Sequence, residues 1–209
     1  MLVDLTLKDF LDKVAGNDPV PGGGSIAALN GAVASALTAM VANLTVGKKG
    51  YEDHEELMQH ISAVALQEKK TFLEDVDRDS EAYDGVFACF KMPKGTDEEK
   101  AARSVAIQEA TKFAALVPMQ VARNAYELMT IVMDVARLGN RNAVTDACVA
   151  MMSARTAVLG ALMNVRINLG SLKDKEFVGK LQTEADELER LACAKEKELL
   201  DEINEELKV

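Results

Sequence analysis

The chain has 209 residues, of which 48% are hydrophobic and 28% charged, and its formal net charge is −10. This length suits one domain over residues 1–209 with a sizeable core. The acidic balance disfavours phosphate backbones, so no nucleic-acid partner is expected. With no Trp, six Phe and three Tyr, the apolar content is mostly small and aliphatic, which favours closely packed helices over sheets.

The cysteines and the N-terminal residues bear on the compartment. Cys89, Cys148 and Cys193 are odd in number and far apart, which predicts reduced thiols and a cytoplasmic location. Five charged residues among the first fourteen are not typical of a signal peptide. His54 and His60 do not share one helical face, so no metal site is expected.

Hydrophobic periodicity, turn residues and capping signals divide the chain into six predicted helices. Thr6 is expected to cap the first helix, and Thr96 with Glu99 predicts a capping box for the fourth. Pro118 is expected to kink or divide the fourth helix. The expected ranges are about 7–14, 25–46, 52–90, 97–138, 144–169 and 173–207.

Two of these helices carry seams of small residues. In the second, such residues recur at steps of four and three from Ala28 to Val46, and in the fifth from Ala143 to Ala161. Small residues let helix backbones approach closely. The sequence therefore predicts an all-α bundle of about six helices in which the second and fifth pack together. Helices of this length favour a homodimer.

The stretch from Ile26 to Val46 is the candidate for a membrane span, because it is about the right length. Its Ala, Asn, Ser and Thr content makes it less apolar than a Leu-rich span. A buried core helix is the simpler interpretation, so no membrane partner is expected.

The glycine run "PGGGS" precedes the second helix. Glycines at such a position let backbone N–H groups approach an anion. No Lys follows them, as a Walker A loop needs, and no strand precedes them, as a dinucleotide-binding loop needs. Two interpretations stay open: a tight turn with Ser25 as N-cap, or contact with a small ligand through Gly22, Gly23, Gly24 and Ser25.

Asp79 lies on an apolar stripe, between Val76 and Tyr83. A carboxylate on a buried stripe is costly unless paired, and burial raises its pKa towards general acid–base use. The alternative is a stripe that rotates here and leaves Asp79 exposed among other acids. We favour a catalytic Asp79.

Lys48, Lys49 and Tyr51 follow the second helix and form a basic point beside an uncharged segment. Cations there either complement the helix dipole or hold an anionic ligand. Asp146, early in the fifth helix, is most simply a favourable charge on that helix's dipole.

Asn164 and Asn168 end the alanine seam one helical turn apart, and Asn43 lies on the second helix. Buried amides need partners, which include a substrate's amide edge. No GxSxG motif or Cys–His pair is evident. Chemistry is therefore expected to use carboxylates, Lys, Tyr and hydrogen-bond donors, as in acid–base cleavage of C–N bonds.

Six segments, spread in order over nearly the full chain, together resemble the formiminotransferase-cyclodeaminase C-terminal domain family. Val20 and Ile26 in the glycine loop, and Thr145, are small departures that remove no candidate catalytic group. The matching segments are "PVPGGGSIAAL" at 19–29, "MVANLTVGKKGY" at 40–51, "DSEAYDGV" at 79–86, "KMPKGTDEEKAARSVAIQEA" at 91–110, "GNRNAVTDA" at 139–147 and "NVRINL" at 164–169.

The resemblance implies an all-helical, dimeric enzyme acting on the one-carbon unit between N5 and N10 of tetrahydrofolate, with no cofactor beyond that substrate. One branch hydrolyses 5,10-methenyltetrahydrofolate to 10-formyltetrahydrofolate, and the other closes 5-formimidoyltetrahydrofolate and releases ammonia. The stand-alone length and the segment at 91–103 favour the cyclohydrolase branch, with no transferase domain expected. The alternatives are a cyclodeaminase and, from another class, a non-catalytic helical interaction module.

The resemblance also suggests roles for the candidate residues. Asp79 is expected to shuttle the proton, and Lys48 also to meet the glutamate tail of the folate. The other catalytic candidates are Asp146 and Tyr51. The residues expected to contact the substrate are Asn43, Asn164 and Asn168 at the pterin edge and the turn Gly22, Gly23, Gly24 and Ser25.

Overall fold

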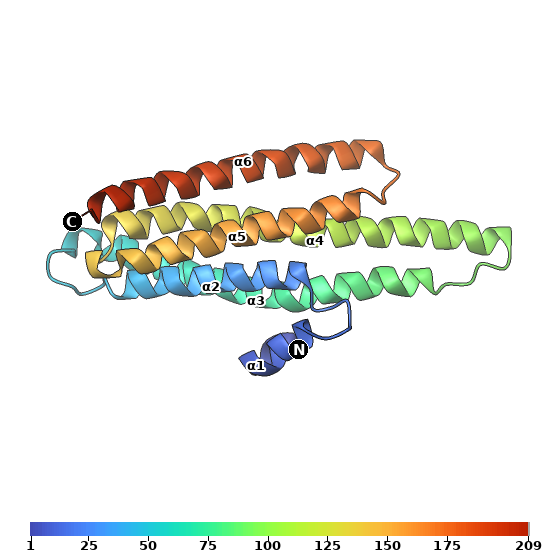
Figure 1. Cartoon of the computed structure of the whole chain (residues 1–209), viewed down its shortest axis with the longest axis horizontal. Helices are drawn as coiled ribbons and strands as arrows, with labels where there is room; N and C mark the ends of the chain where they lie inside the picture. The colour runs from blue at the N-terminus through green and yellow to red at the C-terminus, as the bar shows by residue number, and fades with distance from the viewer. Residues whose placement is uncertain (209) are drawn as a thin grey trace.

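The computed structural model describes residues 1–208, which form an all-α bundle with no strand (Figure 1). The predicted fold class is confirmed. In chain order the elements are the 3-10 turn η1 (Leu2–Asp4), α1 (Leu7–Val14), α2 (Gly23–Asn43), η2 (Glu52–His54), α3 (Glu55–Phe90), α4 (Asp97–Leu138), η3 (Arg141–Ala143), α5 (Val144–Leu169) and α6 (Lys175–Glu206).

The capping residues predicted for α1 and α4 are confirmed. Thr6 accepts a hydrogen bond from the N–H of Asp9, and Thr96 and Glu99 form a capping box. Pro118 lies inside α4, which continues through it as one helix, so the predicted division of this helix is wrong. Pro118 is buried, and packing around it compensates for its missing N–H donor.

Helices α2 and α5 run side by side in opposite directions, as the seams of small residues predict (Figure 1). A Cβ added to Gly160 would lie 3.2 Å from the Cβ of Ala27, and one added to Gly23 would lie 3.5 Å from Nδ2 of Asn164. The start of α2 therefore meets the end of α5. Figure 1 shows α6 along the upper edge of the bundle and α1 below α2.

Helix α3 packs closely on α2 because a glycine faces its largest buried side chain. Phe72 is fully buried, and a Cβ on Gly31 would lie 2.6 Å from its ring. No side chain fits at that distance, so the aromatic ring occupies the space that the glycine leaves.

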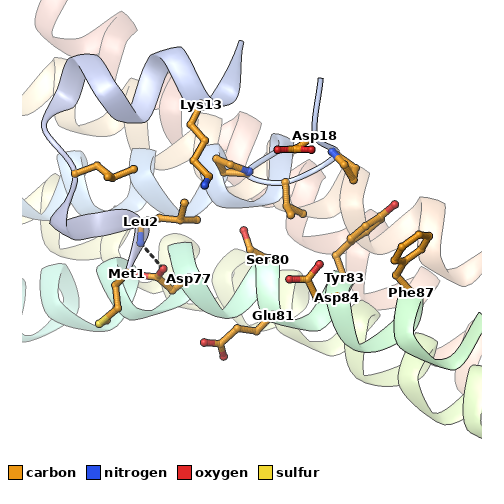
Figure 2. Close-up of a pocket in the computed structure, with 14 residues that line it drawn as sticks. Met1, Leu2, Lys13, Asp18, Asp77, Ser80, Glu81, Tyr83, Asp84 and Phe87 are labelled. Atoms are coloured by element: carbon orange, nitrogen blue, oxygen red, sulfur yellow. Dashed lines mark hydrogen bonds between the residues drawn. The ribbon is translucent and has the colours of Figure 1, made fainter. Parts of the chain in front are cut away.

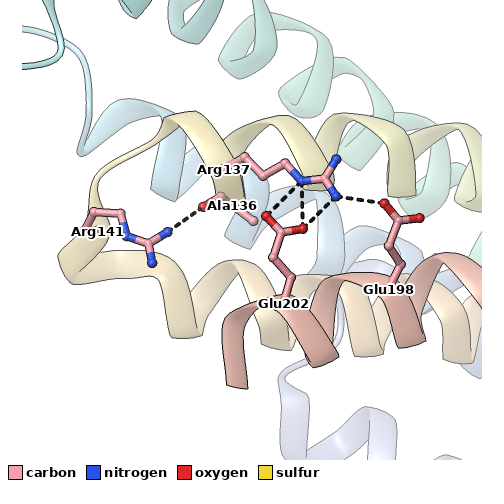
Figure 3. Close-up of polar contacts among 5 residues, drawn as sticks. All are labelled: Ala136, Arg137, Arg141, Glu198 and Glu202. Carbon is pink, nitrogen blue, oxygen red and sulfur yellow. Dashed lines mark hydrogen bonds and ion pairs between the residues drawn. The ribbon is translucent and has the colours of Figure 1, made fainter. Parts of the chain in front are cut away.

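Helix α6 is held to α4 and α5 by arginine–carboxylate pairs. Figure 3 shows Arg137 of α4 donating to Glu198 and Glu202 of α6, at 2.8 and 2.7 Å. Arg123 likewise pairs with Glu184 of α6 at 2.6 Å. The contact between α6 and the rest of the bundle is therefore partly polar, unlike the contact between α2 and α5.

Asp75 of α3 is a buried carboxylate whose charge is only partly balanced by hydrogen bonds and nearby cations. It is 3% exposed, its Oδ2 has no hydrogen-bond partner within residues 1–208, and its nearest cation is Arg78 at 3.6 Å. Burial raises the pKa of Asp75 from 3.8 to about 6, opposed in part by Arg78. The folded state therefore binds the Asp75 proton more tightly than the unfolded chain does. The protonated carboxyl stabilises the fold, and this contribution to the free energy of unfolding is lost as pH rises from about 4 through 6.

We expect Asp75→Asn to stabilise the protein at pH 8, where Asp75 is ionised, by about 2 to 3 kcal/mol. The gain should shrink towards pH 4, because the buried carboxyl is then protonated. Urea unfolding at both pH values measures the effect, with Glu74→Gln on the exposed side of the same helix as control. Equal changes at pH 4 and pH 8 would contradict the assignment.

Candidate functional site

A pocket of about 390 Å³ opens where the start of α2 meets the end of α5 and the last third of α3. The linker before α2 covers one side, and Ala114 of α4 contributes to the lining. Its full lining is Pro19, Val20, Gly22, Gly23, Gly24, Asp79, Ala82, Tyr83, Val86, Ala114, Asn164, Ile167, Asn168 and Ser171. We call it the Asp79 pocket, because Asp79 is the one acidic or basic residue in that lining.

Asp79 reaches α2 through the space left by Gly24. Its Oδ2 accepts a hydrogen bond from the hydroxyl of Ser25 at 3.1 Å. A Cβ on Gly24 would lie 2.0 Å from Oδ1 of Asp79, so Gly24 is required for this approach. Asp79 is partly buried rather than exposed among the neighbouring acids, which favours the first of the two interpretations of its stripe.

Burial raises the pKa of the Asp79 carboxyl above its ordinary range, and hydrogen bonds from the side chain and backbone of Ser25 oppose the rise. A raised pKa makes a carboxylate a better proton acceptor and brings its protonated form nearer to neutral pH. The environment of Asp79 therefore suits proton transfer in both directions.

Ser25 does not act as the N-cap, which was one of its two predicted roles. The N-cap is Gly22, with no side-chain hydrogen bond, and the Ser25 hydroxyl faces Asp79 and Ser80 instead. The first N–H groups of a helix have no partner within it and carry the positive end of its dipole. The first N–H groups of α2 border the Asp79 pocket, beside the carboxylate of Asp79.

Asn164 and Asn168, which the sequence predicts to contact the substrate, line the pocket, and their amides are held by the backbone. Nδ2 of Asn164 donates to the carbonyl of Gly160 at 2.9 Å. Nδ2 of Asn168 donates to the carbonyls of Ala114 and Asn164, each at 2.9 Å. These bonds fix both side chains and leave their Oδ1 atoms as acceptors for a ligand's N–H groups.

The remaining walls are apolar, with Tyr83 as the aromatic group. Tyr83 is 41% exposed and stacks on Phe87 with ring centroids 6.4 Å apart. Val20, Val86 and Ile167 complete an apolar surface around the polar groups. A planar heterocycle with hydrogen-bonding edges fits such a lining.

A second hollow, of about 560 Å³, lies on the other side of the Pro19–Pro21 linker and shares Tyr83 with the Asp79 pocket (Figure 2). Its floor includes Asp77, which accepts a hydrogen bond from the N–H of Leu2 at 2.6 Å. Lys13 is its one cationic residue, in a lining that also holds Asp18 and three further acids.

Four predicted site residues lie away from the Asp79 pocket in the same chain. Helix α2 has 21 residues, so its ends are about 30 Å apart at 1.5 Å per residue. The glycines are at one end and Asn43 at the other, with the loop that carries the basic residues following it. The four are Asn43, Lys48, Tyr51 and Asp146.

These four residues gather at the opposite end of the bundle. Oδ1 of Asn43 accepts from Ser62 at 2.7 Å, and the Tyr51 hydroxyl accepts from the N–H of Arg141 at 3.0 Å. Asp146 is in the first turn of α5, while the pocket is at its last turns. Their predicted roles stay predictions, and a single chain does not bring them to Asp79.

Sequence reasoning did not identify Tyr83 as part of the site or the need for Gly24 beside Asp79. A signal for Tyr83 was present, because it follows Asp79 by one helical turn. Within residues 1–208 no group of three or more His, Cys, Asp and Glu side chains is arranged to hold a metal ion.

Comparison with known proteins identifies relatives over most of the chain. The family model described as formiminotransferase-cyclodeaminase matches residues 6–187. A methenyltetrahydrofolate cyclohydrolase of Methylorubrum extorquens is 41% identical over 82% of this chain and 83% of its own length. A formimidoyltransferase-cyclodeaminase of Rattus norvegicus is 32% identical over 84% of this chain. The matched region covers only 32% of the length of that relative.

A solved structure has the same fold. The crystal structure of a formiminotetrahydrofolate cyclodeaminase from Thermotoga maritima superposes with a TM-score of 0.85 at 32% identity, covering 97% of this chain and 99% of the other. The bundle and the placement of its helices are therefore shared with an experimentally determined relative.

Proposed function

We propose that this chain, which belongs to the formiminotransferase-cyclodeaminase family, is an enzyme of folate one-carbon metabolism that hydrolyses 5,10-methenyltetrahydrofolate to 10-formyltetrahydrofolate. The observation that carries the proposal is the Asp79 pocket, in which one partly buried carboxyl with a raised pKa faces a lining suited to a planar heterocycle. The cyclohydrolase of Methylorubrum extorquens, 41% identical over most of both chains, supports this branch of the family.

The reaction needs one group that first accepts and then donates a proton. Ionised Asp79 removes a proton from water as its oxygen attacks the methenyl carbon, which gives a tetrahedral carbon between N5 and N10. The protonated Asp79 then donates to N5, the C–N5 bond breaks, and the formyl group stays on N10. Donation to N5 regenerates the Asp79 carboxylate, and the proton of the former hydroxyl leaves to solvent as the carbonyl forms.

The surroundings of Asp79 suit the changes of charge that occur during these reaction steps. The methenyl substrate carries a delocalised positive charge, which the Asp79 carboxylate stabilises on binding. The Ser25 hydroxyl, at 3.1 Å, keeps the carboxylate oriented while the proton moves. We expect the Oδ1 atoms of Asn164 and Asn168 to accept hydrogen bonds from the amino and amide edge of the pterin.

A second candidate is closure of 5-formimidoyltetrahydrofolate with release of ammonia. The solved relative from Thermotoga maritima carries that name and shares the fold over nearly the full chain, which favours this alternative. Both reactions pass through a tetrahedral carbon between two nitrogens and use the same proton acceptor and donor. The pocket accommodates either.

Further properties follow as parts of the proposal. Acid–base chemistry of this kind needs no cofactor beyond the tetrahydrofolate derivative, and we expect a cytoplasmic homodimer that binds neither nucleic acid nor membrane. The acidic composition and the three free cysteines support that expectation. A non-catalytic helical module is less favoured, because a scaffold gains little from a partly buried carboxyl in a pocket.

Two assays run side by side test the function. Loss of the methenyltetrahydrofolate absorbance measures hydrolysis, and ammonia release from 5-formimidoyltetrahydrofolate measures cyclodeamination. We expect the purified chain to accelerate the first reaction above its spontaneous rate, with little ammonia release. Ammonia release alone would move the assignment to the cyclodeaminase, and activity in neither assay would contradict both.

A further inference from the structure

Pro118 is the one proline that lies inside a helix within residues 1–208. It is buried about halfway along α4. A proline has no backbone N–H, so it cannot donate the helical hydrogen bond to the carbonyl of the residue four positions earlier. In α4 the carbonyl that loses this bond is that of Ala114. Of the 42 residues of α4, Ala114 alone has no backbone N–H four residues further along.

The carbonyl of Ala114 has a partner from another helix, at the wall of the Asp79 pocket. Nδ2 of Asn168, on α5, donates to this carbonyl at 2.9 Å, and both residues line the pocket. Ala114 is buried, and a buried carbonyl without any donor would be destabilising. The one carbonyl that α4 leaves without a helical donor is therefore the one that a pocket residue uses.

The contact between Asn168 and Ala114 differs from the amide contact of Asn164. Asn164 donates to the carbonyl of Gly160, four residues earlier on its own helix, and such local contacts are common for Asn in helices. The bond from Asn168 to Ala114 instead joins residues 54 apart in the sequence. It needs a carbonyl of α4 that is directed to α5. Pro118 provides one, because no N–H at position 118 competes with Asn168 for this carbonyl.

The hydrogen bonds of the Asn168 amide fix which of its two ends is left for a ligand. Nδ2 donates to the carbonyls of Ala114 and Asn164, each at 2.9 Å, so both of its N–H groups are used. A flipped amide would place Oδ1 against two carbonyl oxygens, which are acceptors only. Asn168 therefore offers an acceptor, and not a donor, to whatever occupies the pocket.

We propose that Pro118 is a positioning residue of the Asp79 pocket, because it leaves the carbonyl of Ala114 free to hold Asn168 with its acceptor available to the ligand. The pocket then selects a ligand that presents an N–H donor at this point, as the amino and N–H edge of a pterin does. The positioning of Asn168 is argued from the hydrogen bonds alone, whereas the identity of the ligand rests on the proposed function.

The bond between Asn168 and Ala114 is not needed to hold α4 against the end of α5. Gln108 of α4 donates to the carbonyl of Ser171 at 3.0 Å and accepts from the N–H of Lys173 at 2.8 Å. Proline is also the least favourable residue for a helix interior, and alanine is the most favourable. Neither helix stability nor the attachment of α5 therefore accounts for Pro118, whereas the orientation of Asn168 does.

Urea unfolding of a double-mutant cycle tests this positioning without any activity. In the wild type, Asn168→Ala leaves the Ala114 carbonyl without a donor and should raise the unfolding equilibrium constant roughly 30-fold. In a Pro118→Ala background the new N–H serves that carbonyl, so the same change should raise the constant only about threefold.

The matched control for this cycle is a Val121→Ala background. Val121 is buried one helical turn after Pro118, and its truncation removes packing without adding a donor. Asn168→Ala should keep its roughly 30-fold effect there. Equal effects of Asn168→Ala in the wild type and in the Pro118→Ala protein would overturn the proposal.

Steady-state kinetics test the consequence for the ligand. Pro118→Ala should raise KM for methenyltetrahydrofolate about three- to tenfold, the size of one hydrogen bond. We expect kcat to change less than about twofold, because Asn168 binds the pterin and moves no proton. In an Asn168→Ala background, Pro118→Ala should have no further effect on KM. Effects that multiply, as two independent packing changes would, or a wild-type KM for Pro118→Ala, would overturn the proposal.

An ester bond at position 118 separates the missing N–H from the shape of the proline ring. Incorporation of lactic acid in place of Pro118 gives the side chain of alanine without an N–H. This variant should keep the wild-type KM, whereas Pro118→Ala should not. An ester variant with the KM of Pro118→Ala would assign the effect to the ring and overturn the proposal. An inactive wild type with the expected urea result would count against the proposed function only.

Discussion

Asp79→Asn is expected to lower kcat for methenyltetrahydrofolate hydrolysis by about 10³-fold, the usual size of a lost general base and acid. The amide is nearly the same size as the carboxyl and keeps a hydrogen-bond partner in Ser25, so folding should be preserved. Stopped-flow absorbance measures the rate, and a thermal melt checks the fold. Asp84→Asn, exposed on the same helix, is the matched control and should keep the wild-type rate.

The pH profile gives an independent test of Asp79. Since burial raises the pKa of its carboxyl, hydrolysis should decline as pH falls through a value above the ordinary aspartate range, because the base is then protonated. A folded Asp79→Asn variant that keeps more than about one-third of wild-type turnover would exclude Asp79 as the proton carrier.

Gly24→Ala is expected to reduce kcat/KM by about 10² to 10³-fold, although it adds only a methyl group. The new Cβ would lie 2.0 Å from Oδ1 and 2.5 Å from Cγ of Asp79, so the carboxyl must move off Ser25 or the helices must separate. A misplaced catalytic group costs about 10²-fold or more. The strain should also lower the free energy of unfolding by about 1 to 3 kcal/mol.

The matched control for Gly24 is Gly85→Ala, on α3. Nothing lies within 4 Å of a Cβ added there, so activity should be unchanged and stability should rise by up to about 1 kcal/mol from helix propensity. Steady-state kinetics and urea unfolding of both variants separate the two effects. A fully active Gly24→Ala protein would show that Asp79 does not need its observed position.

Much of the fold was predictable because its helices carry clear periodic and capping signals. The small-residue seams on α2 and α5 specified their contact, since only small side chains let two backbones come so close. Pro118 does not divide α4 as the sequence predicts, because a proline indicates a lost hydrogen bond but not the packing that compensates for it. Tertiary contacts decide such cases.

The candidate site was predictable only in part. Asp79, Asn164 and Asn168 follow from polar residues on apolar stripes, which one sequence reveals. Nearness in sequence to the uncharged helix suggests that Lys48 belongs to the same site, but that helix has 21 residues and separates Lys48 from the glycines. The close approach of Asp79 to Gly24 depends on how two helices pack, and no local pattern records that distance.

The two close glycine contacts on α2 have a joint consequence for how Asp79 is positioned. Gly24 and Gly31 are seven residues apart on α2, and the side chains that meet them, Asp79 and Phe72, are seven apart on the antiparallel α3. A helix that slid along its neighbour by one residue would drive the Phe72 ring into a side chain. The contact between Phe72 and Gly31 thus fixes the register of α3 on α2. It sets the position of Asp79 from two helical turns away, although it takes no part in the chemistry.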